Sequence, residues 1–344
     1  MKKTYLVTGG SGFLGSALVR RMIRDGYTVK VFDDNSRGSL ARLEDVRGSF
    51  EFIEGDIRNP EAVERAAQGV DAICHMAFIN GTEFFYSRPE LVLEVGVKGI
   101  MNVIDACRKH NIGELILASS SEVYQTPPQV PTPETVHLVV PDPLNPRYSY
   151  GAGKIISEVV ALNYGRTLLD RVVIFRPHNV YGPDMGWEHV VPQFVVRMQE
   201  ACRQPEDPIR FPIQGTGKQT RSFIYINDFT DGLMLTIEKG EHLGIYHIGT
   251  VDEVSVEDLA TLVGEYFERR VVVMPSEAPL GGTMRRCPDI TKLTTLGFRS
   301  KYTLRDGVWP TAAWYAKHSD RRPSRLNPTP VAPIPEHTAI QEEK

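Results

Sequence analysis

Short apolar segments alternate with longer stretches of helical periodicity through the first half of the chain. Apolar runs of four to eight residues are typical of buried parallel strands, and apolar residues at every third or fourth position indicate helices between them. The strands are expected at residues 4–8, 28–33, 51–56, 71–77, 114–119 and 171–176. Helices are expected after the first strand to about Asp25, from about Pro89 to His110 and from about Tyr148 to Gly165. This alternation predicts an α/β fold with a Rossmann-type, doubly wound parallel sheet.

The pattern becomes looser beyond Arg176, where loops rich in proline and glycine separate shorter elements. We expect residues 1–178 to form the Rossmann domain, with a return segment near 219–240. Residues 179–317 are expected to form mainly a smaller C-terminal α/β portion that binds the substrate. The last segment, 318–344, has five prolines among polar residues. That composition predicts a disordered tail.

Charge and cysteine content exclude several classes of protein. The formal net charge of -4 provides no basic excess for general nucleic-acid binding. Neither a basic run for a membrane surface nor an uninterrupted apolar segment is present, because glycines break the N-terminal apolar stretch. The cysteines are far apart and lack the spacing of a metal site: Cys74, Cys107, Cys202 and Cys287. We therefore expect reduced thiols, no metal and a cytoplasmic location.

A glycine-rich turn follows the first predicted strand and opens a helix. Gly9, Gly12 and Gly15 lie in TGGSGFLG, where glycines permit close approach of backbone N–H groups to a pyrophosphate. Asp33 ends the second strand and can accept hydrogen bonds from both adenosine-ribose hydroxyls. Its charge would repel a 2′-phosphate, although Arg37 is near enough in sequence to offset that repulsion. The arrangement predicts NAD as the cofactor.

Two residues after the third strand have two interpretations. Asp56 and Ile57 can flank the adenine of the dinucleotide. They can equally be a strand end followed by a helix cap. Their sequence positions leave both interpretations open.

The strongest chemical signal is the pair Tyr150 and Lys154 in YGAGK. A spacing of four residues puts both side chains on one face of a helix. A lysine ammonium and the positive nicotinamide ring would favour the phenolate, so that Tyr150 could take a proton from a substrate hydroxyl. Ser120, at the end of the fifth strand, could donate to the same hydroxyl. The alternative for Tyr150 and Lys154 is a pair of side chains on an exposed helix. The alternative for Ser120 is a place in a polar loop or helix cap.

Several motifs in order resemble one family. They are TGGSGFLG, Asp33, HMA (75–77), SSSEVY, YGAGK, RPHNVYGP (176–183), GKQTRSF (217–223) and RRCPDI (285–290). Over roughly residues 1–315 the chain resembles the extended short-chain dehydrogenase/reductases, and within them the NAD-dependent nucleotide-sugar epimerase, decarboxylase and dehydratase family. The resemblance implies a homodimer formed through helices around 90–109 and 149–164.

The resemblance also implies roles for individual residues. NAD would be bound by Gly9, Gly12, Phe13, Leu14, Gly15, Asp33, Asp56, Ile57, Tyr150 and Lys154. The catalytic residues would be Ser120, Glu122, Tyr150 and Lys154. The diphosphate of the nucleotide sugar would be held by Asn179, Arg221 and Arg286, and a guanidinium fork matches phosphate oxygens.

The chain departs from the family pattern at three places near the site. The segment Gly96-Val-Lys-Gly99-Ile100 replaces the usual NxxGT, and Gln125 replaces the glycine of VYG. His178 is not the usual residue before Asn179. The loops 78–87 and 184–189 are expected to shape the sugar pocket.

Relatives of this type oxidise C4 of the sugar and then diverge. We expect a 4-epimerase first, because that reaction needs only Ser120 and Tyr150. A decarboxylase comes second, since Ser121-Glu122 resembles UDP-glucuronate decarboxylases; Glu122 could be a base at C5 or a cap of the local turn. A 4,6-dehydratase comes third, because its Asp-Glu pair is missing. A 3,5-epimerase-like variant, suggested by His178, and a non-enzymatic NAD sensor remain alternatives.

Overall fold

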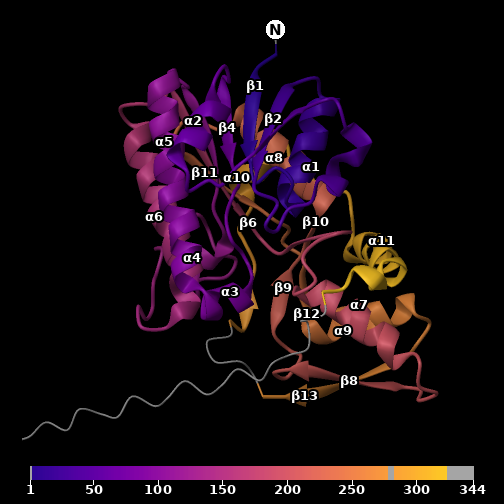
Figure 1. The fold of residues 1–344 in the computed structure, drawn as a ribbon. Helices are drawn as coiled ribbons and strands as arrows, with labels where there is room; N and C mark the ends of the chain where they lie inside the picture. Colours follow the sequence, from indigo (N-terminus) through magenta and orange to yellow (C-terminus); the bar gives the residue numbers. More distant parts are fainter. Residues whose placement is uncertain (1, 278–282, 324–344) are drawn as a thin grey trace, which may run out of the picture.

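The computed structural model describes residues 2–277 and 283–323. A parallel seven-stranded sheet forms the centre of the larger part, in the order β11-β6-β5-β4-β1-β2-β3 (Figure 1). Its strands are β1 (Thr4–Thr8), β2 (Thr28–Asp33), β3 (Glu51–Glu54), β4 (Ala72–His75), β5 (Glu114–Ala118), β6 (Arg171–Pro177) and β11 (Gly244–Ile248). The predicted Rossmann-type sheet is confirmed. The strand order reverses between β1 and β4, and in such sheets ligands bind at that point.

Helices cover both faces of the sheet. On one face lie α1 (Phe13–Arg24), α8 (Ile226–Lys239) and α10 (Thr291–Thr295). The other face is covered by α2 (Pro60–Ala67), α4 (Pro89–Leu93), α5 (Gly99–His110) and α6 (Ser149–Gly165). Figure 1 shows the two layers on opposite sides of the strands.

Alternation of side chains along each strand fills two separate cores. On β1, Val7 packs in the core beneath α1, whereas its neighbour Leu6 packs in the core beneath α2 and α5. On β6, Val173 packs in the same core as Val7, and Ile174 packs in the same core as Leu6. Because both faces are buried, these strands are continuously apolar, as parallel strands usually are.

The elements differ from the sequence expectation in three details. The helix predicted over 89–110 is interrupted by a π-helical turn at Glu94–Lys98, which joins α4 to α5. Strands β3 and β4 are shorter than expected. The sheet also receives an edge strand, β11, from residues beyond the expected return segment 219–240, since β11 pairs with β6.

The smaller part contains short strands and helices below the sheet in Figure 1. Its strands are β7 (Val180–Tyr181), β8 (Ile209–Gln214), β9 (Thr220–Ser222), β10 (Ile224–Tyr225), β12 (Glu253–Ser255), β13 (Val271–Ser276) and β14 (Arg285–Arg286). Its helices are α7 (Val190–Ala201), α9 (Val256–Tyr266) and α11 (Leu304–Lys317), and α3 (Thr82–Ser87) lies at the edge of the larger part. Of the predicted tail, residues 324–344 lie outside the described residues. No helix in the described ranges is both long and apolar enough to cross a membrane.

Candidate active site

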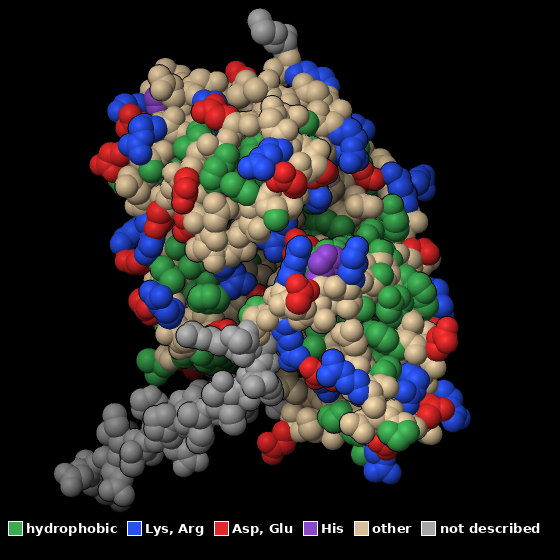
Figure 2. All heavy atoms as spheres, turned by 45° about the vertical axis from the view of Figure 1, so that its right-hand side comes forward, with side chains coloured by type: hydrophobic (Ala, Val, Ile, Leu, Met, Phe, Trp, Pro, Cys, Tyr) green, Lys and Arg blue, Asp and Glu red, His purple; other side chains and the backbone are tan. Residues whose placement is uncertain are grey.

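A cavity of about 670 Å³ opens at the carboxyl ends of the central strands. It runs from the glycine turn before α1, past the residues that follow β4, to Ser120 and the start of α6. Figure 2 shows a hollow between the two parts of the molecule, with charged and histidine side chains at its rim. The cavity therefore joins the expected cofactor residues to the expected catalytic ones.

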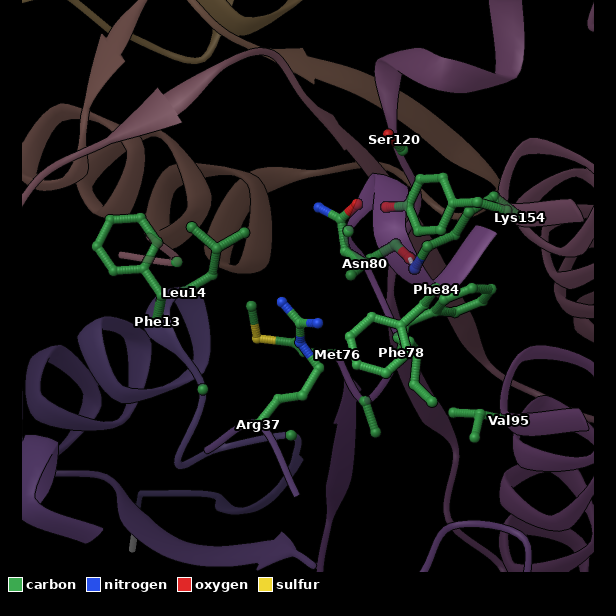
Figure 3. Close-up of a pocket in the computed structure, with 18 of the residues that line it drawn as sticks. Phe13, Leu14, Arg37, Met76, Phe78, Asn80, Phe84, Val95, Ser120 and Lys154 are labelled. Atoms are coloured by element: carbon green, nitrogen blue, oxygen red, sulfur yellow. Dashed lines mark hydrogen bonds between the residues drawn. The ribbon is translucent and has the colours of Figure 1, made fainter. Parts of the chain in front are cut away.

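The glycine turn packs so closely against neighbouring backbone that two of its positions leave no space for a side chain. Gly9 has a φ of +70°, and a Cβ there would lie 2.7 Å from the Ala77 backbone nitrogen. A Cβ at Gly15 would collide with the Gly9 carbonyl oxygen. Gly12 begins α1 without any side-chain cap, so the helix presents free N–H groups at its positive end. Phe13 and Leu14 line the cavity there (Figure 3), and this cradle fits a pyrophosphate.

Asp33 is buried at the end of β2 and is held by backbone donors. Its two carboxylate oxygens accept hydrogen bonds from the Ser11 N–H at 3.0 Å and the Asn35 N–H at 2.9 Å. A carboxylate has about four acceptor positions, so two remain for ribose hydroxyls. Arg37 instead donates to Glu188 across the cavity and lies with its guanidinium 4.8 Å from the Phe84 ring centroid. The charge of Arg37 is thus already paired, which leaves Asp33 to act on the ribose.

Asp56 and Ile57 both line the cavity after β3. The Asp56 carboxylate accepts from the Arg58 guanidinium at 2.6 Å, and this bond lowers the pKa of Asp56. The buried Ile57 lies against Gly99. Helix α2 is capped by Asn59, whose side chain accepts from the Ala62 N–H. The alternative of Asp56 as the helix cap is therefore not observed.

Tyr150 and Lys154 lie on the buried face of α6, near Ser120 after β5. Lys154 donates through Nζ to the Ala118 carbonyl oxygen at 2.6 Å. The Tyr150 ring lies between Phe78, edge-on at 5.2 Å, and Phe85, stacked at 5.1 Å between centroids. Figure 3 shows Ser120 and Lys154 at the same end of the cavity. The structure brings together the three residues that the sequence analysis chose.

Burial changes the protonation of this group. It raises the pKa of Tyr150, and a hydrogen bond with Ser120 offsets that effect only in part. Burial also lowers the pKa of Lys154 to about 7, although Glu158 opposes the change. From the sequence, Lys154 and the nicotinamide ring are expected to lower the pKa of Tyr150. The protein alone raises it, because the dry surroundings penalise the phenolate.

Glu122 and Arg286 form an ion pair in the cavity, with Nη1 and Oε1 2.5 Å apart. Burial alone would raise the pKa of Glu122, but Arg286, together with the charges of Arg147 and Arg221, lowers it. The local turn Ser121–Tyr124 is capped by Ser120, whose Oγ accepts from the Glu122 N–H at 3.1 Å. The Glu122 carboxylate is thus directed to Arg286 and is not the cap.

The expected diphosphate ligands are only partly assembled. Asn179 and Arg286 line the cavity, whereas Arg221 is absent from its described lining. The Asn179 amide donates to the Ser222 carbonyl oxygen at 2.8 Å. Arg221 donates to the backbone oxygens of Thr220 and Thr283. Since β9 and β14 pair in register, Arg221 still lies beside Arg286.

Two departures from the family pattern have structural explanations. Gln125 adopts a φ of +53°, which a glycine tolerates more easily, and its side chain donates to the Glu122 carbonyl oxygen at 2.6 Å. His178 is buried and does not line the cavity, as far as the described residues show. The 3,5-epimerase alternative, which was based on His178, therefore gains no support.

Residues of both loops that were expected to shape the sugar pocket, 78–87 and 184–189, line the cavity, and Phe78 is among them. Arg147 also lines the cavity and was not predicted from the sequence. It lies three residues before Tyr150, and this closeness to a recognised motif was the available signal. A single arginine is too common for its type alone to reveal a role.

Known proteins are similar to this chain in sequence and fold. The chain is 34% identical to UDP-glucuronic acid decarboxylase 2 of Arabidopsis thaliana over 311 residues, covering 88% of this chain and 66% of that protein. It thus spans about two thirds of that plant relative. A UDP-N-acetyl-alpha-D-glucosaminuronate decarboxylase of Bacillus cytotoxicus is 28% identical, covering 92% of this chain and 98% of that protein.

A solved structure extends the comparison to epimerases. The NAD complex of UDP-glucose 4-epimerase from Thermus thermophilus superposes with a TM-score of 0.78 at 26% identity, covering 91% of this chain and 99% of that one. Residues 5–249 match the NAD dependent epimerase/dehydratase family. That match confirms the predicted family, the enzyme class and NAD dependence. The chain belongs to the NAD dependent epimerase/dehydratase family.

Proposed function

We propose that this chain is a decarboxylase of a nucleotide-linked uronic acid. A 4-epimerase is the first expectation from the sequence, and the site geometry moves the decarboxylase ahead of it. The observation that carries the proposal is the set of three arginines, Arg147, Arg221 and Arg286, whose charges act on Glu122. The matched relatives include decarboxylases of two uronic acids, which supports the same choice.

The charge of Arg147 points to a carboxylate on the sugar. Arg286 at the cavity, with Arg221 beside it, supplies guanidinium groups for a diphosphate. Arg147 is a further cation at the cavity, and no acidic side chain in the described ranges forms an ion pair with it. A neutral hexose offers this guanidinium no charged partner. A uronic acid does, because its carboxylate can take both N–H groups of the fork.

The opening step is oxidation at C4. The glycine turn, Asp33 and Lys154 would hold NAD, which would supply the hydride acceptor when bound. Tyr150 accepts the proton of the C4 hydroxyl as the C4 hydrogen leaves with its electron pair. Ser120 donates to the same oxygen and keeps it in place. Charged Lys154 favours the phenolate form of Tyr150.

Oxidation makes the substrate a β-keto acid, because its carboxylate is attached to C5, next to the new ketone. The bond from C5 to the carboxylate carbon breaks, its electron pair moves into the ketone as an enolate, and CO₂ leaves. C5 then takes up a proton. Tyr150 returns its proton to the C4 oxygen when the alcohol is restored, for which bound cofactor would supply the hydride. Glu122 is ionised in its pair with Arg286, so it positions that arginine or accepts a proton and does not serve as the acid.

A 4-epimerase remains the second candidate. Ser120 and Tyr150 suffice for oxidation and reduction at C4, and the superposed epimerase has the same fold. A dehydratase is less well supported, since it needs an acid and Glu122 is held as a carboxylate. The proposal is tested by mass spectrometry of reactions with UDP-glucuronate and UDP-glucose. Loss of CO₂ from the uronate supports it, and epimerisation of UDP-glucose with no change to the uronate contradicts it.

The organisation of the molecule completes the proposal. Residues 1–178, with the return through α8, bind NAD, and 179–317 supply most of the nucleotide-sugar contacts.

A homodimer through α5 and α6 is supported by Ile156 and Val159, which are 40% and 52% exposed on one face of α6. Light scattering that finds a monomer at micromolar concentration would reject the dimer. The four cysteines are unpaired, as expected in the cytoplasm.

A further inference from the structure

We propose that Phe78 is a positioning residue that keeps the Lys154 ammonium charged beside Tyr150, and that glycine at position 96 makes room for the Phe78 ring. The inference rests on the proposed roles of Tyr150 and Lys154 in the oxidation step. It assigns a function to a residue that lies between the cofactor end and the catalytic end of the cavity.

The Phe78 ring occupies a socket between two helices. A Cβ at Gly96, in the π-helical turn Glu94–Lys98, would lie 2.5 Å from Cζ of Phe78. A Cβ at Gly153 on α6 would lie 3.1 Å from the same atom. The tip of the ring therefore fills the space left by two missing side chains. The π-helical turn agrees with this assignment, since such turns are frequent at functional sites.

The face of the same ring covers the catalytic lysine (Figure 3). Nζ of Lys154 lies 4.0 Å from the Phe78 ring centroid, well within cation–π range. Lys154 is 3% exposed, and its hydrogen bond in the described structure goes to the Ala118 carbonyl oxygen. A carbonyl and an aromatic face thus replace much of the water that the ammonium has lost. The edge-on contact of Phe78 with Tyr150 fixes the second catalytic ring as well.

The other ionisable groups around Lys154 leave this role to Phe78. Glu158, one turn along α6, favours the charged lysine. His75 on β4 is held neutral, because burial and then Lys154 lower its pKa to about 3. Tyr150 is neutral in the resting protein because burial raises its pKa. With burial lowering the pKa of Lys154 to about 7, a modest aromatic contribution decides its charge near neutral pH.

The departure at Gly96 follows from the same packing. Any side chain at residue 96 would push the Phe78 ring out of its socket. A glycine at 96 and a phenylalanine at 78 are therefore a matched pair. We expect Gly96→Ala to imitate the loss of Phe78, and to add little when Phe78 has already been shortened to leucine.

The experiment is a pH titration of Lys154 by NMR in the full chain with NAD, with lysine labelled at Cε. Phe78→Leu should lower the Lys154 pKa by roughly half a unit to one and a half units. Phe84→Leu is the matched control, because that ring faces Arg37. Fluorinated phenylalanine at position 78 keeps the ring shape and weakens its negative face, so it should produce a smaller shift in the same direction.

An unchanged Lys154 pKa in both the leucine and the fluorinated variants would overturn the proposal. Folding is checked by circular dichroism, and the fluorinated variant provides the result if Phe78→Leu does not fold. The pH–rate profile gives a second readout, since the ionisation of Tyr150 should move to higher pH when Lys154 loses its charge more easily. The change in the Lys154 pKa is measured without turnover. The role of Phe78 is therefore tested separately from the proposed reaction.

Discussion

Glu158 and Arg176 form a bidentate ion pair behind Ser120, and both side chains are only 2% exposed. Nη2 of Arg176 lies 2.6 Å from Oε2 of Glu158, and Nε lies 2.8 Å from Oε1. Glu158 also accepts from Ser119, and Arg176 donates to the Tyr124 hydroxyl. The pair therefore holds both ends of the segment that carries Ser120 and Glu122.

Removing one partner of this pair should destabilise the whole larger part. Glu158→Ala leaves the Arg176 charge buried and unpaired, which costs roughly 3–5 kcal/mol of the free energy of unfolding. Urea denaturation measures the loss. Glu64→Ala, which breaks an exposed pair with Lys109, is the control and should leave the midpoint unchanged. Equal urea midpoints for Glu158→Ala and Glu64→Ala would show that the buried pair does not stabilise the fold.

Lys154 should make stability depend on pH. Its pKa falls from the ordinary 10.5 to about 7 on folding, so the unfolded chain binds more protons between these values. Stability from this group should therefore rise as the pH increases from about 7 to about 10.5. Lys154→Met should abolish that rise, so the difference in free energy of unfolding between wild type and variant should change between about pH 7 and about pH 10.5. A wild type and variant with parallel pH–stability curves would contradict the assignment.

Arg147 should discriminate between charged and neutral sugars. Arg147→Gln removes one charge-assisted contact with the uronate carboxylate. The KM of the variant for UDP-glucuronate should therefore rise by roughly 10- to 100-fold. Binding of UDP-glucose should change little, because that sugar has no carboxylate. Arg166→Gln, just after α6, is the surface control. An equal loss of affinity for both nucleotide sugars would place Arg147 on the diphosphate.

The first half of the fold could be predicted closely because its signals are local. Strands at 4–8 and 28–33 match β1 and β2 because a buried parallel strand is apolar along its whole length. The pairing of β8 with β13 could not be predicted in this way. Its strands are far apart in the sequence, and β13 is mostly exposed, so neither periodicity nor proximity indicates the partner.

The site shows the same division between local and distant information. Tyr150 and Lys154 could be found because helical spacing alone puts them together. Glu122 and Arg286 were each recognised from a motif, but their ion pair joins two remote segments and depends on β14 lying beside β9. The contact between Phe78 and Gly96 could not be predicted from the sequence, because only three-dimensional packing brings the two residues together.

Asp33 should set the choice of cofactor. Asp33→Ala removes two charge-assisted hydrogen bonds to the ribose and should weaken NAD binding by roughly 1–3 kcal/mol. It should also reduce the difference in affinity between NAD and NADP. Isothermal titration calorimetry with each cofactor measures both effects. Asp34→Ala, at the exposed neighbouring residue, is the control. A wild type that binds NADP more tightly than NAD would contradict the role of Asp33.

The most direct test of the account is the turnover of Tyr150→Phe. The change removes one oxygen and keeps the ring between Phe78 and Phe85, so the fold and NAD binding should be preserved. Turnover of the nucleotide sugar should fall by at least roughly 100-fold, the contribution of a positioned general base. The account predicts a folded variant that binds NAD and is nearly inactive. A folded variant that binds NAD and turns over at close to the wild-type rate would contradict it.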